Sequence, residues 1–344
     1  MHRKHASLLL LVVVALAGCR PAGPRRHRPS THLALARMEK GEARFQIVDV
    51  SRAKPVFSQE IAVPDALTAT QGSPREPLAT NVGTELFVLV GRAGDAEIVR
   101  IPKSGARSRL RTSLKLQSAQ LTPRPLRVVD GRLFLVTTTG ILSTRLSEER
   151  EYLEPLDAAG LDHFATLSGD LVTAHDLRVG DPFDWQVLRL RGSGSLLPIG
   201  RLSGDLLKDV VARDGADQAD HGVLFVTSGG ALRSIFVEPG KRVTESEATL
   251  EGAEGGLGSL AVLDREASIC SRRLFALPVA FDSNSRAREV DGASCQDLVG
   301  RGPVWVLGRK PQELVRIDLD GAGRAAVVAR HLVPGDTKWE ALVR

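Results

Sequence analysis

From residue 31 onward, the chain repeats one pattern of apolar and polar positions. A short run of apolar residues ends at a turn containing Gly or Asp, and a second run follows in which apolar and charged residues alternate. Short apolar runs between turns are typical of strands buried on both faces, and alternation is typical of strands nearer the solvent. The sequence therefore predicts a series of β-hairpins with little helix. The paired segments are 85–90 with 97–101, 132–136 with 141–146, 170–174 with 186–190, 223–226 with 232–237, and 304–307 with 313–317.

The spacing of these hairpins predicts a regular repeat. One marker in each first strand gives intervals of 47, 38, 53 and 80 residues, and the longest interval contains a weaker copy at 267–270. Five steps therefore cover 218 residues, which is about 44 residues per step. Repeats of about 40–50 residues are typical of propeller blades, in which each repeat forms a four-stranded sheet. The markers are Leu86, Leu133, Leu171, Leu224 and Val304.

The two ends of this region predict how the repeat closes. It begins with a hairpin, 32–35 and 45–50, that lacks an inner strand, and it ends with a strand at 339–343 that lacks a hairpin. Pairing these ends completes one unit and removes the exposed edges of an open sheet. The pattern resembles the all-β propeller superfold across residues 31–344. It predicts seven blades closed by the C-terminal strand, with six or eight as alternatives because the weak copy near residue 270 can be counted differently.

The first thirty residues predict an export signal. Arg3 and Lys4 precede an apolar run at 8–17, which is too short for a membrane span and is typical of a secretory signal. The sequence 16–19, Leu-Ala-Gly-Cys, resembles the lipobox of bacterial lipoproteins. That resemblance implies that 1–18 is removed and that Cys19 becomes a lipidated N-terminus, which anchors the protein in the lipid bilayer. The alternative is an ordinary secretory signal in which the Cys occurs by chance.

The residues after Cys19 indicate a tether and the location of the protein in the cell. Residues 20–30 contain three Pro and four Arg and are typical of a solvated tether, so we expect a single domain at 31–344 and a tether at 19–30. Residue 20 is Arg, whereas in enteric lipoproteins Asp at this position favours retention at the inner membrane. The resemblance therefore implies the bacterial cell envelope, at the outer membrane and facing the periplasm.

The net charge of +5 does not indicate a nucleic-acid partner. Six of the basic residues and none of the acidic ones lie in residues 1–30. The remaining 40 basic and 41 acidic residues nearly cancel, whereas nucleic-acid binding requires a basic face on the folded domain. We therefore expect no nucleic acid among the partners.

Cys270 and Cys295 are the only cysteines besides Cys19. Export places them in an oxidising compartment, which favours a disulfide. Two buried free thiols, or a redox or metal role, are the alternatives. No Cys-x-x-Cys or paired Cys/His spacing indicates zinc.

A group of polar residues falls where the inner strands should begin. In a propeller these positions line the mouth of the central channel, so residues distant in sequence converge there. Carboxylates, an amide and an imidazole suit Ca²⁺ binding or proton transfer. Calcium-dependent lactonase propellers have a comparable ring, although none of their motifs is present, and a solvated channel lining is the alternative. The candidates are Asn81, Asp162, His163, Asp209, Asp297 and Glu340.

Motifs for other chemistry are missing from the sequence. Neither the G-x-S-x-G elbow of hydrolases nor a nucleotide-binding glycine loop occurs. We therefore expect a non-catalytic, membrane-anchored propeller without a cofactor, which binds a protein or an envelope polymer. The alternatives are a metal-assisted lactonase or hydrolase, with Ca²⁺ at the channel mouth, and a propeller that binds a sugar or another small ligand without turnover.

Overall fold

The computed structural model describes most of the chain after the first thirty residues. The described ranges are 31–68, 76–92, 95–104, 106–112, 121–148, 150–156, 163–166, 171–175, 185–202, 207–214, 221–227, 231–237, 244–249, 259–263, 266–278, 285–300, 303–335 and 338–343. Within these ranges the regular structure is all β. They contain no helix that is long and apolar enough to span a membrane.

The described strands form four-stranded units, which we number in chain order from the unit that contains the first strand. The strands of units 1 to 4 are β28 (Ala341–Val343), β1 (His32–Glu39), β2 (Glu42–Asp49) and β3 (Val56–Val63); β4 (Ala79–Val82), β5 (Glu85–Arg92), β6 (Asp95–Ile101) and β7 (Ser108–Thr112); β8 (Leu121–Val129), β9 (Arg132–Thr137), β10 (Gly140–Arg145) and β11 (Tyr152–Leu156); β12 (His163–Thr166), β13 (Leu171–His175), β14 (Trp185–Leu190) and β15 (Leu196–Leu202). The strands of units 5 to 7 are β16 (Leu207–Asp214), β17 (His221–Thr227), β18 (Ala231–Val237) and β19 (Thr244–Thr249); β20 (Leu260–Leu263), β21 (Glu266–Cys270), β22 (Arg273–Pro278) and β23 (Arg288–Ser294); β24 (Asp297–Val299), β25 (Val304–Leu307), β26 (Glu313–Leu319) and β27 (Ala325–Leu332).

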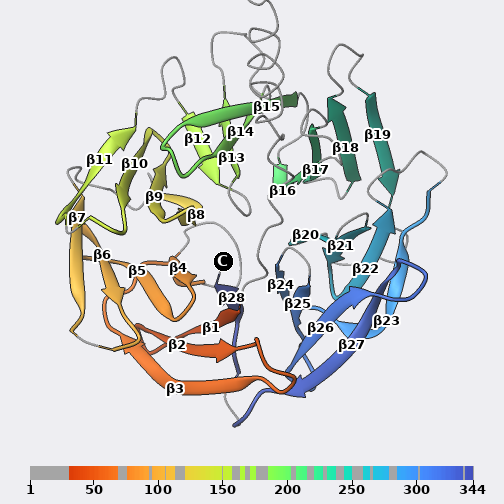
Figure 1. Ribbon diagram of the computed structural model, residues 1–344, viewed down its shortest axis with the longest axis horizontal. Coiled ribbons are helices and arrows are strands. Elements are labelled where there is room, and N and C mark those ends of the chain that lie inside the picture. The colour runs from red at the N-terminus through yellow and green to blue at the C-terminus, as the bar shows by residue number, and fades with distance from the viewer. Residues whose placement is uncertain are drawn as a thin grey trace, which may run out of the picture.

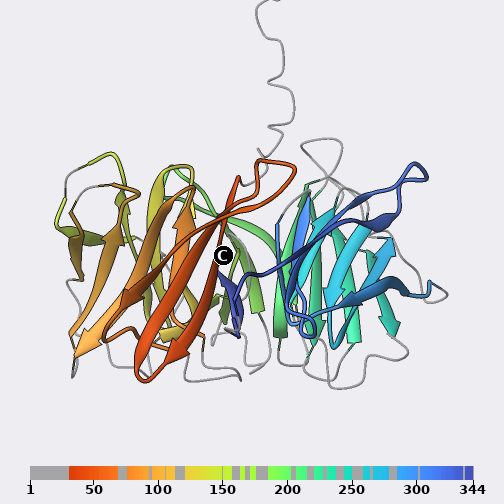
Figure 2. The ribbon, with the colours of Figure 1, turned by 90° about the horizontal axis from the view of Figure 1, so that it is seen from below.

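These units surround a central axis (Figures 1 and 2). In each unit the strand named first above, which is β28 in unit 1, is the inner strand. This arrangement is the β-propeller that the repeat predicts. Units 2 and 3 belong to one eight-stranded sheet, because β7 and β11 pair in parallel at Arg111 with Tyr152 and at Thr112 with Leu153. Counted as units of four, the described strands give seven; counted as continuous sheets, they give six. The number of blades thus depends on how the joined sheet is divided.

Both faces of the inner hairpins are buried, which explains their continuous apolar runs. On β1, Ala34 and Ala36 pack with residues of unit 2, including Val88. The alternate residues Leu33 and Leu35 pack with unit 7. A strand whose neighbours cover both faces has no polar side, so it reads as apolar throughout rather than as alternating.

Tight turns set the register of two hairpins. Lys40 and Gly41 join β1 to β2 with φ values of 50° and 86°, and Asp130 and Gly131 join β8 to β9 with 46° and 76°. Positive φ at both central residues matches the right-handed twist of antiparallel strands. Glycine at the second position adopts this conformation without a Cβ penalty.

The chain ends close the ring, as the sequence predicts. β28 pairs antiparallel with β1, at Ala34 with Val343 and at Ala36 with Ala341. Both chain ends of this sheet lie near the centre of Figure 1. One detail of the prediction is wrong, because the closing strand begins at Ala341 rather than at Trp339. The Trp339 backbone instead bonds to a side chain, since its N–H donates to Gln312 Oε1 at 2.8 Å.

Candidate functional site

The candidates for a channel-mouth site lie in or beside inner strands, but the expectation that all of them lie at strand starts is wrong for Asn81. This residue is next to the end of its four-residue strand and therefore at the opposite end of the inner strands from Asp297 and Glu340. Asn81 lies in β4, His163 begins β12, Asp209 lies in β16, Asp297 begins β24, and Glu340 directly precedes β28. Asp162 and Cys19 lie outside the described residues. At His163 and Asp209 the structure describes the strand but not the side chain, so the geometry of the site comes from the other three residues.

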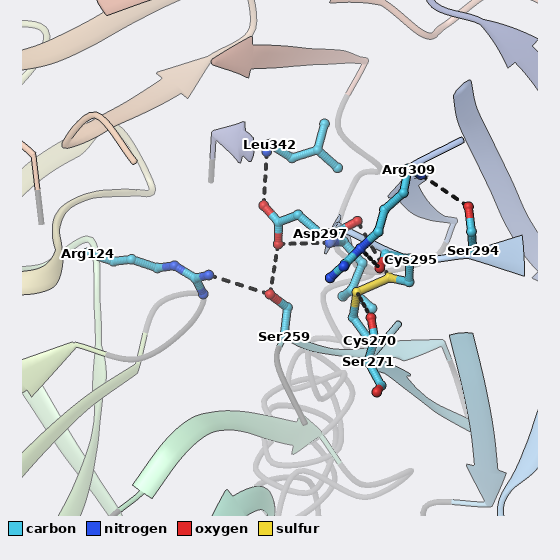
Figure 3. Close-up of a disulfide and its surroundings, with 10 residues drawn as sticks. Arg124, Ser259, Cys270, Ser271, Ser294, Cys295, Asp297, Arg309 and Leu342 are labelled. Atoms are coloured by element: carbon cyan, nitrogen blue, oxygen red, sulfur yellow. Dashed lines mark hydrogen bonds between the residues drawn. A yellow bond between two sulfur atoms is a disulfide. The ribbon is translucent and has the colours of Figure 1, made fainter. Parts of the chain in front are cut away.

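Among the three candidates whose side chains the structure describes, Asp297 is the most deeply buried, with 3% exposure. Its Oδ1 accepts hydrogen bonds from Ser259 Oγ at 2.7 Å and from the Leu298 N–H at 2.9 Å. Its Oδ2 accepts a hydrogen bond from the Leu342 N–H at 2.9 Å. Ser259 precedes β20 and Leu342 lies in β28, so one carboxylate joins the inner strands of units 6, 7 and 1 (Figure 3).

An arginine from across the ring extends this network. Arg124 lies in β8 of unit 3, and its Nη2 donates to Ser259 Oγ at 3.5 Å (Figure 3). The hydroxyl can accept this bond because its own proton points to Asp297. The path from Arg124 to Asp297 therefore links a positive group on one side of the channel to a buried carboxylate on the other.

Glutamine side chains hold the segment that leads into β28. Gln312 Nε2 donates to the Trp339 carbonyl at 2.6 Å. Gln296 Nε2 donates to the same carbonyl at 3.0 Å and to the Glu340 carbonyl at 2.6 Å. Trp339 is 2% exposed, and the guanidinium of Arg37 lies 5.4 Å from its ring centroid, within the range of a cation–π contact.

Asn81 and Glu340 also take part in local bonds. Asn81 Nδ2 donates to the Gly83 carbonyl at 3.3 Å and to the His32 carbonyl at 3.5 Å. Glu340 Oε2 accepts from the Met38 N–H at 3.4 Å. The structure thus places Asp297 against β28 through Leu342, whereas the side chain of Glu340 reaches β1.

Cys270 and Cys295 form a disulfide with a Cα–Cα distance of 5.5 Å, which is the pairing expected from export. Cys270 ends β21, and Cys295 lies in the link between units 6 and 7. Both residues are buried, at 2% and 0% exposure. The covalent bond lies two residues from Asp297, so it supports the same region of the ring (Figure 3).

No group of three or more His, Cys, Asp or Glu side chains that could hold a metal ion occurs among the described residues. Ser259, Arg124 and Gln312 are not among the residues that the sequence pattern singles out. One signal was available for Ser259, because it directly precedes an inner strand as the other candidates do. For Arg124 and Gln312 no local signal exists, since their partners lie in other units.

Comparison with known proteins supports the fold and does not name a family. No protein-family model matches the chain, and no curated protein matches it in sequence. Among solved structures, a protein from Lactobacillus plantarum aligns with a TM-score of 0.55 at 10% identity, covering 92% of this chain and 99% of the other. The periplasmic gluconolactonase PpgL of Pseudomonas aeruginosa aligns with a TM-score of 0.50 at 13% identity, covering 92% and 99%. Sqt1 of Saccharomyces cerevisiae aligns with a TM-score of 0.50 at 9% identity, covering 90% and 88%.

At these identities the likeness extends to the fold alone. The class of protein is therefore a β-propeller, and proteins of this fold carry many unrelated functions.

Proposed function

We propose that the chain is a membrane-anchored β-propeller that binds a protein or envelope-polymer partner and does not catalyse a reaction. One observation carries this proposal: the carboxylate of Asp297 accepts hydrogen bonds from Ser259 Oγ and from the Leu342 N–H, which belong to the two neighbouring units, as well as from the Leu298 N–H of its own strand. A catalytic or metal-binding carboxylate needs free lone pairs toward a ligand. Bonds to neighbouring units thus occupy part of the acceptor capacity of one of the six residues that the sequence offers for chemistry, which supports a structural role for it.

The direction of the strands supports a specific orientation toward the membrane. β28 ends beside the start of β1, since Val343 pairs with Ala34. The strand β1 therefore starts on the same face of the ring as the one on which the inner strand β28 ends. A tether at 19–30 joined to this face would turn the opposite face toward potential partners. Lipidation at Cys19 and an outer-membrane location facing the periplasm are part of this proposal.

The anchor is tested by replacing its lipidated residue. Wild-type protein should incorporate labelled palmitate and fractionate with membranes, whereas Cys19→Ala should lose both properties because a single thioether anchor is removed. Cys270→Ala is the matched control and should keep the label. Incorporation that persists in Cys19→Ala would contradict the lipid anchor.

Binding is tested by in-cell crosslinking on native membranes, followed by mass spectrometry. A protein or polymer that recurs with the wild type, and that is lost when excess unlabelled propeller competes, supports the proposal. Only lipid adducts across repeated experiments would overturn it.

A metal-assisted lactonase or hydrolase is the second candidate. It is favoured by the backbone positions of His163 and Asp209, which lie at the starts of two successive inner strands. The gluconolactonase named above shares the fold, and nothing further transfers from it to this chain. Stoichiometric Ca²⁺ in protein purified without chelators, together with a higher melting temperature on adding Ca²⁺, would favour the enzyme over the scaffold.

A further inference from the structure

The outer strand of unit 7 leaves part of its edge open. β27 ends its sheet on the outer side of the ring, at the lower right of Figure 1. Its first residue is covered by unit 6, because the Ala325 N–H donates to Glu266 Oε2 and its carbonyl accepts from Arg288 Nη2 at 2.8 Å. A shift in register then leaves Val328 without a partner residue on β26, and among the described strands only β26 pairs with residues 329–332.

The backbone of this stretch turns alternate groups away from the sheet. Just after it, the Val333 N–H donates to the Gln312 carbonyl at 3.1 Å, so Val333 faces the β26 side. In an antiparallel pair, residues that bond to the partner strand alternate with residues that point away from it. Arg330 and Leu332 therefore turn their N–H and C=O groups outward, toward the place that a further strand would occupy.

The side chains of the open stretch are apolar and exposed. Leu332 is 70% exposed and Val328 is 50% exposed. Between them, Arg330 pairs with Glu313 at 2.6 Å and donates to the Gly292 carbonyl at 2.7 Å, so its charge is balanced within the protein. Covering the two aliphatic side chains would remove apolar surface from water.

The other outer strands have features that protect an edge. Open edges promote pairing with other chains, and charges, prolines or a covering element prevent it. β7 and β11 pair with each other, which also shows that an outer strand of this ring can accept a further strand. β15 contains Pro198, and β3, β19 and β23 contain acidic residues, which are Glu60, Glu245, Glu247, Glu289 and Asp291. β27 contains neither a proline nor an acidic residue.

The size of the open stretch favours a flexible polypeptide as its partner. Residues 328–332 span about 17 Å. Two rigid rings that met only there would bury well under the about 1,200 Å² of a stable interface, which argues against a second copy of the chain. An extended peptide needs no matching rigid surface, and its main chain repeats N–H and C=O groups at the spacing of the strand. A polysaccharide has no such repeat of main-chain donors and acceptors.

We infer that residues 328–332 of β27 bind an extended segment of a partner protein, which adds a fifth strand to unit 7 and places aliphatic side chains against Val328 and Leu332. This inference rests on the proposed binding function and selects a protein over an envelope polymer. Because the contact is short, we expect weak binding in solution, and the proposed tether would raise the effective concentration at the membrane.

The test uses full-length protein in detergent and a fluorescein-labelled octapeptide of alternating Val and Thr, with anisotropy as the readout. One control peptide is N-methylated at four consecutive residues, which removes donors from both of its edges. The other has Ser in place of Val. The wild type should bind the Val–Thr peptide at least about tenfold more tightly than either control.

Variants separate the side chains from the backbone. Val328→Lys/Leu332→Lys should weaken binding about tenfold or more, because lysines protect an open edge. Leu332→Pro removes an outward N–H and should weaken binding more than Leu332→Ala, which removes apolar contact alone. Val56→Lys changes a 47% exposed residue on β3 and is the matched control, which should bind like the wild type.

Equal binding of the N-methylated peptide, or full binding by the double lysine variant with an unchanged melting temperature, would overturn the inference. A dimer in sedimentation that the double lysine variant abolishes would assign the edge to a second copy and would also overturn it. Crosslinking in cells that recovers one partner equally with the wild type and the double lysine variant would remove this edge and leave the scaffold function standing. Peptide binding without any partner in cells would support the edge and remove the scaffold function instead.

Discussion

Two boundaries of the ring are held together by different kinds of bond. We call the boundary where the chain ends meet the closing seam, and the boundary between units 2 and 3, where β7 pairs with β11, the rim seam. At the closing seam, the three-residue strand β28 lies near the axis; Asp297 of unit 7 bonds to β28 itself, and Gln312 bonds to Trp339 just before it. Between units 2 and 3 the extra bonds lie at the rim and are main-chain bonds, such as the Arg111 N–H to the Glu151 carbonyl at 2.7 Å.

The difference shows how geometry decides the kind of bond. A strand of three residues offers few backbone bonds, so the closing seam depends on side chains that a single mutation can remove. Both seams have apolar packing, but the rim seam adds backbone bonds, which no single polar side chain controls. The closing seam should therefore be the more sensitive of the two.

The largest effect is expected from removing the closing segment. Deleting residues 339–344 should lower the free energy of unfolding by more than about 5 kcal/mol, because loss of the buried Trp339 alone accounts for about 3–5 kcal/mol. Lys338→Ala, at an exposed residue beside the segment, is the control and should change stability by at most about 0.5 kcal/mol. Urea denaturation measures both, and a cooperative wild-type-like transition in the deletion variant would refute the idea that β28 closes the ring.

Removing one carboxylate at each seam allows a direct comparison of the two seams. Asp297→Ala leaves three donors without their acceptor and should cost about 3–5 kcal/mol. Glu154→Ala, at the rim, removes a side chain that is 65% exposed and should cost at most about 0.5 kcal/mol. Equal shifts of the urea midpoint in the two variants would abolish the contrast between the seams.

The disulfide should contribute slightly less than Asp297. Replacing Cys270 and Cys295 together by Ser opens a loop with a separation of 25 residues and should cost about 3–4 kcal/mol on the chain-entropy model. Unfolding of the wild type with and without reductant provides an independent measurement. Identical midpoints under the two conditions would show that the bond does not stabilise this part of the ring.

The smallest effect concerns pH at the outer part of the closing seam. His331 lies on β27 with its ring 6.4 Å from that of Trp305, and burial followed by the charge of Lys54 holds its pKa below the usual 6.5. Because the pKa of His331 is lower in the folded protein, the unfolded chain binds a proton first as the pH falls. The free energy of unfolding is therefore undiminished above pH 6.5 and declines as the pH falls below it. His331→Asn should flatten the stability profile below that pH by a few tenths of a kcal/mol. A wild-type slope in the variant would exclude His331 as its source.

Much of the fold could be predicted from local pattern. The apolar runs identified the inner hairpins because strands covered on both faces lack a polar side, as on β1 between units 7 and 2. The repeat length indicated propeller units, and the two incomplete ends indicated closure. The parallel joining of β7 and β11 had no signal, since it depends on how two neighbouring outer strands approach.

The candidate site was predicted only in part. Counting strand starts located Asp297 and Glu340 beside the closing segment. It did not show that Asp297 would bond to Ser259 and Leu342, because those partners lie 38 and 45 residues away and converge only in the ring. A carboxylate at a channel mouth is compatible with chemistry or with fastening, and the sequence alone does not distinguish the two.

What the sequence by itself determined is the strand repeat, the meeting of the two ends and the resemblance of 16–19 to a lipoprotein signal, because each depends on residues close together in the chain or on simple counting. What only the tertiary structure decided is which polar side chains of the described residues bond to one another. Hydrogen bonding acts over about 3 Å, and only the closed ring brings Arg124, Ser259, Asp297 and Leu342 within that range of one another's bonding atoms.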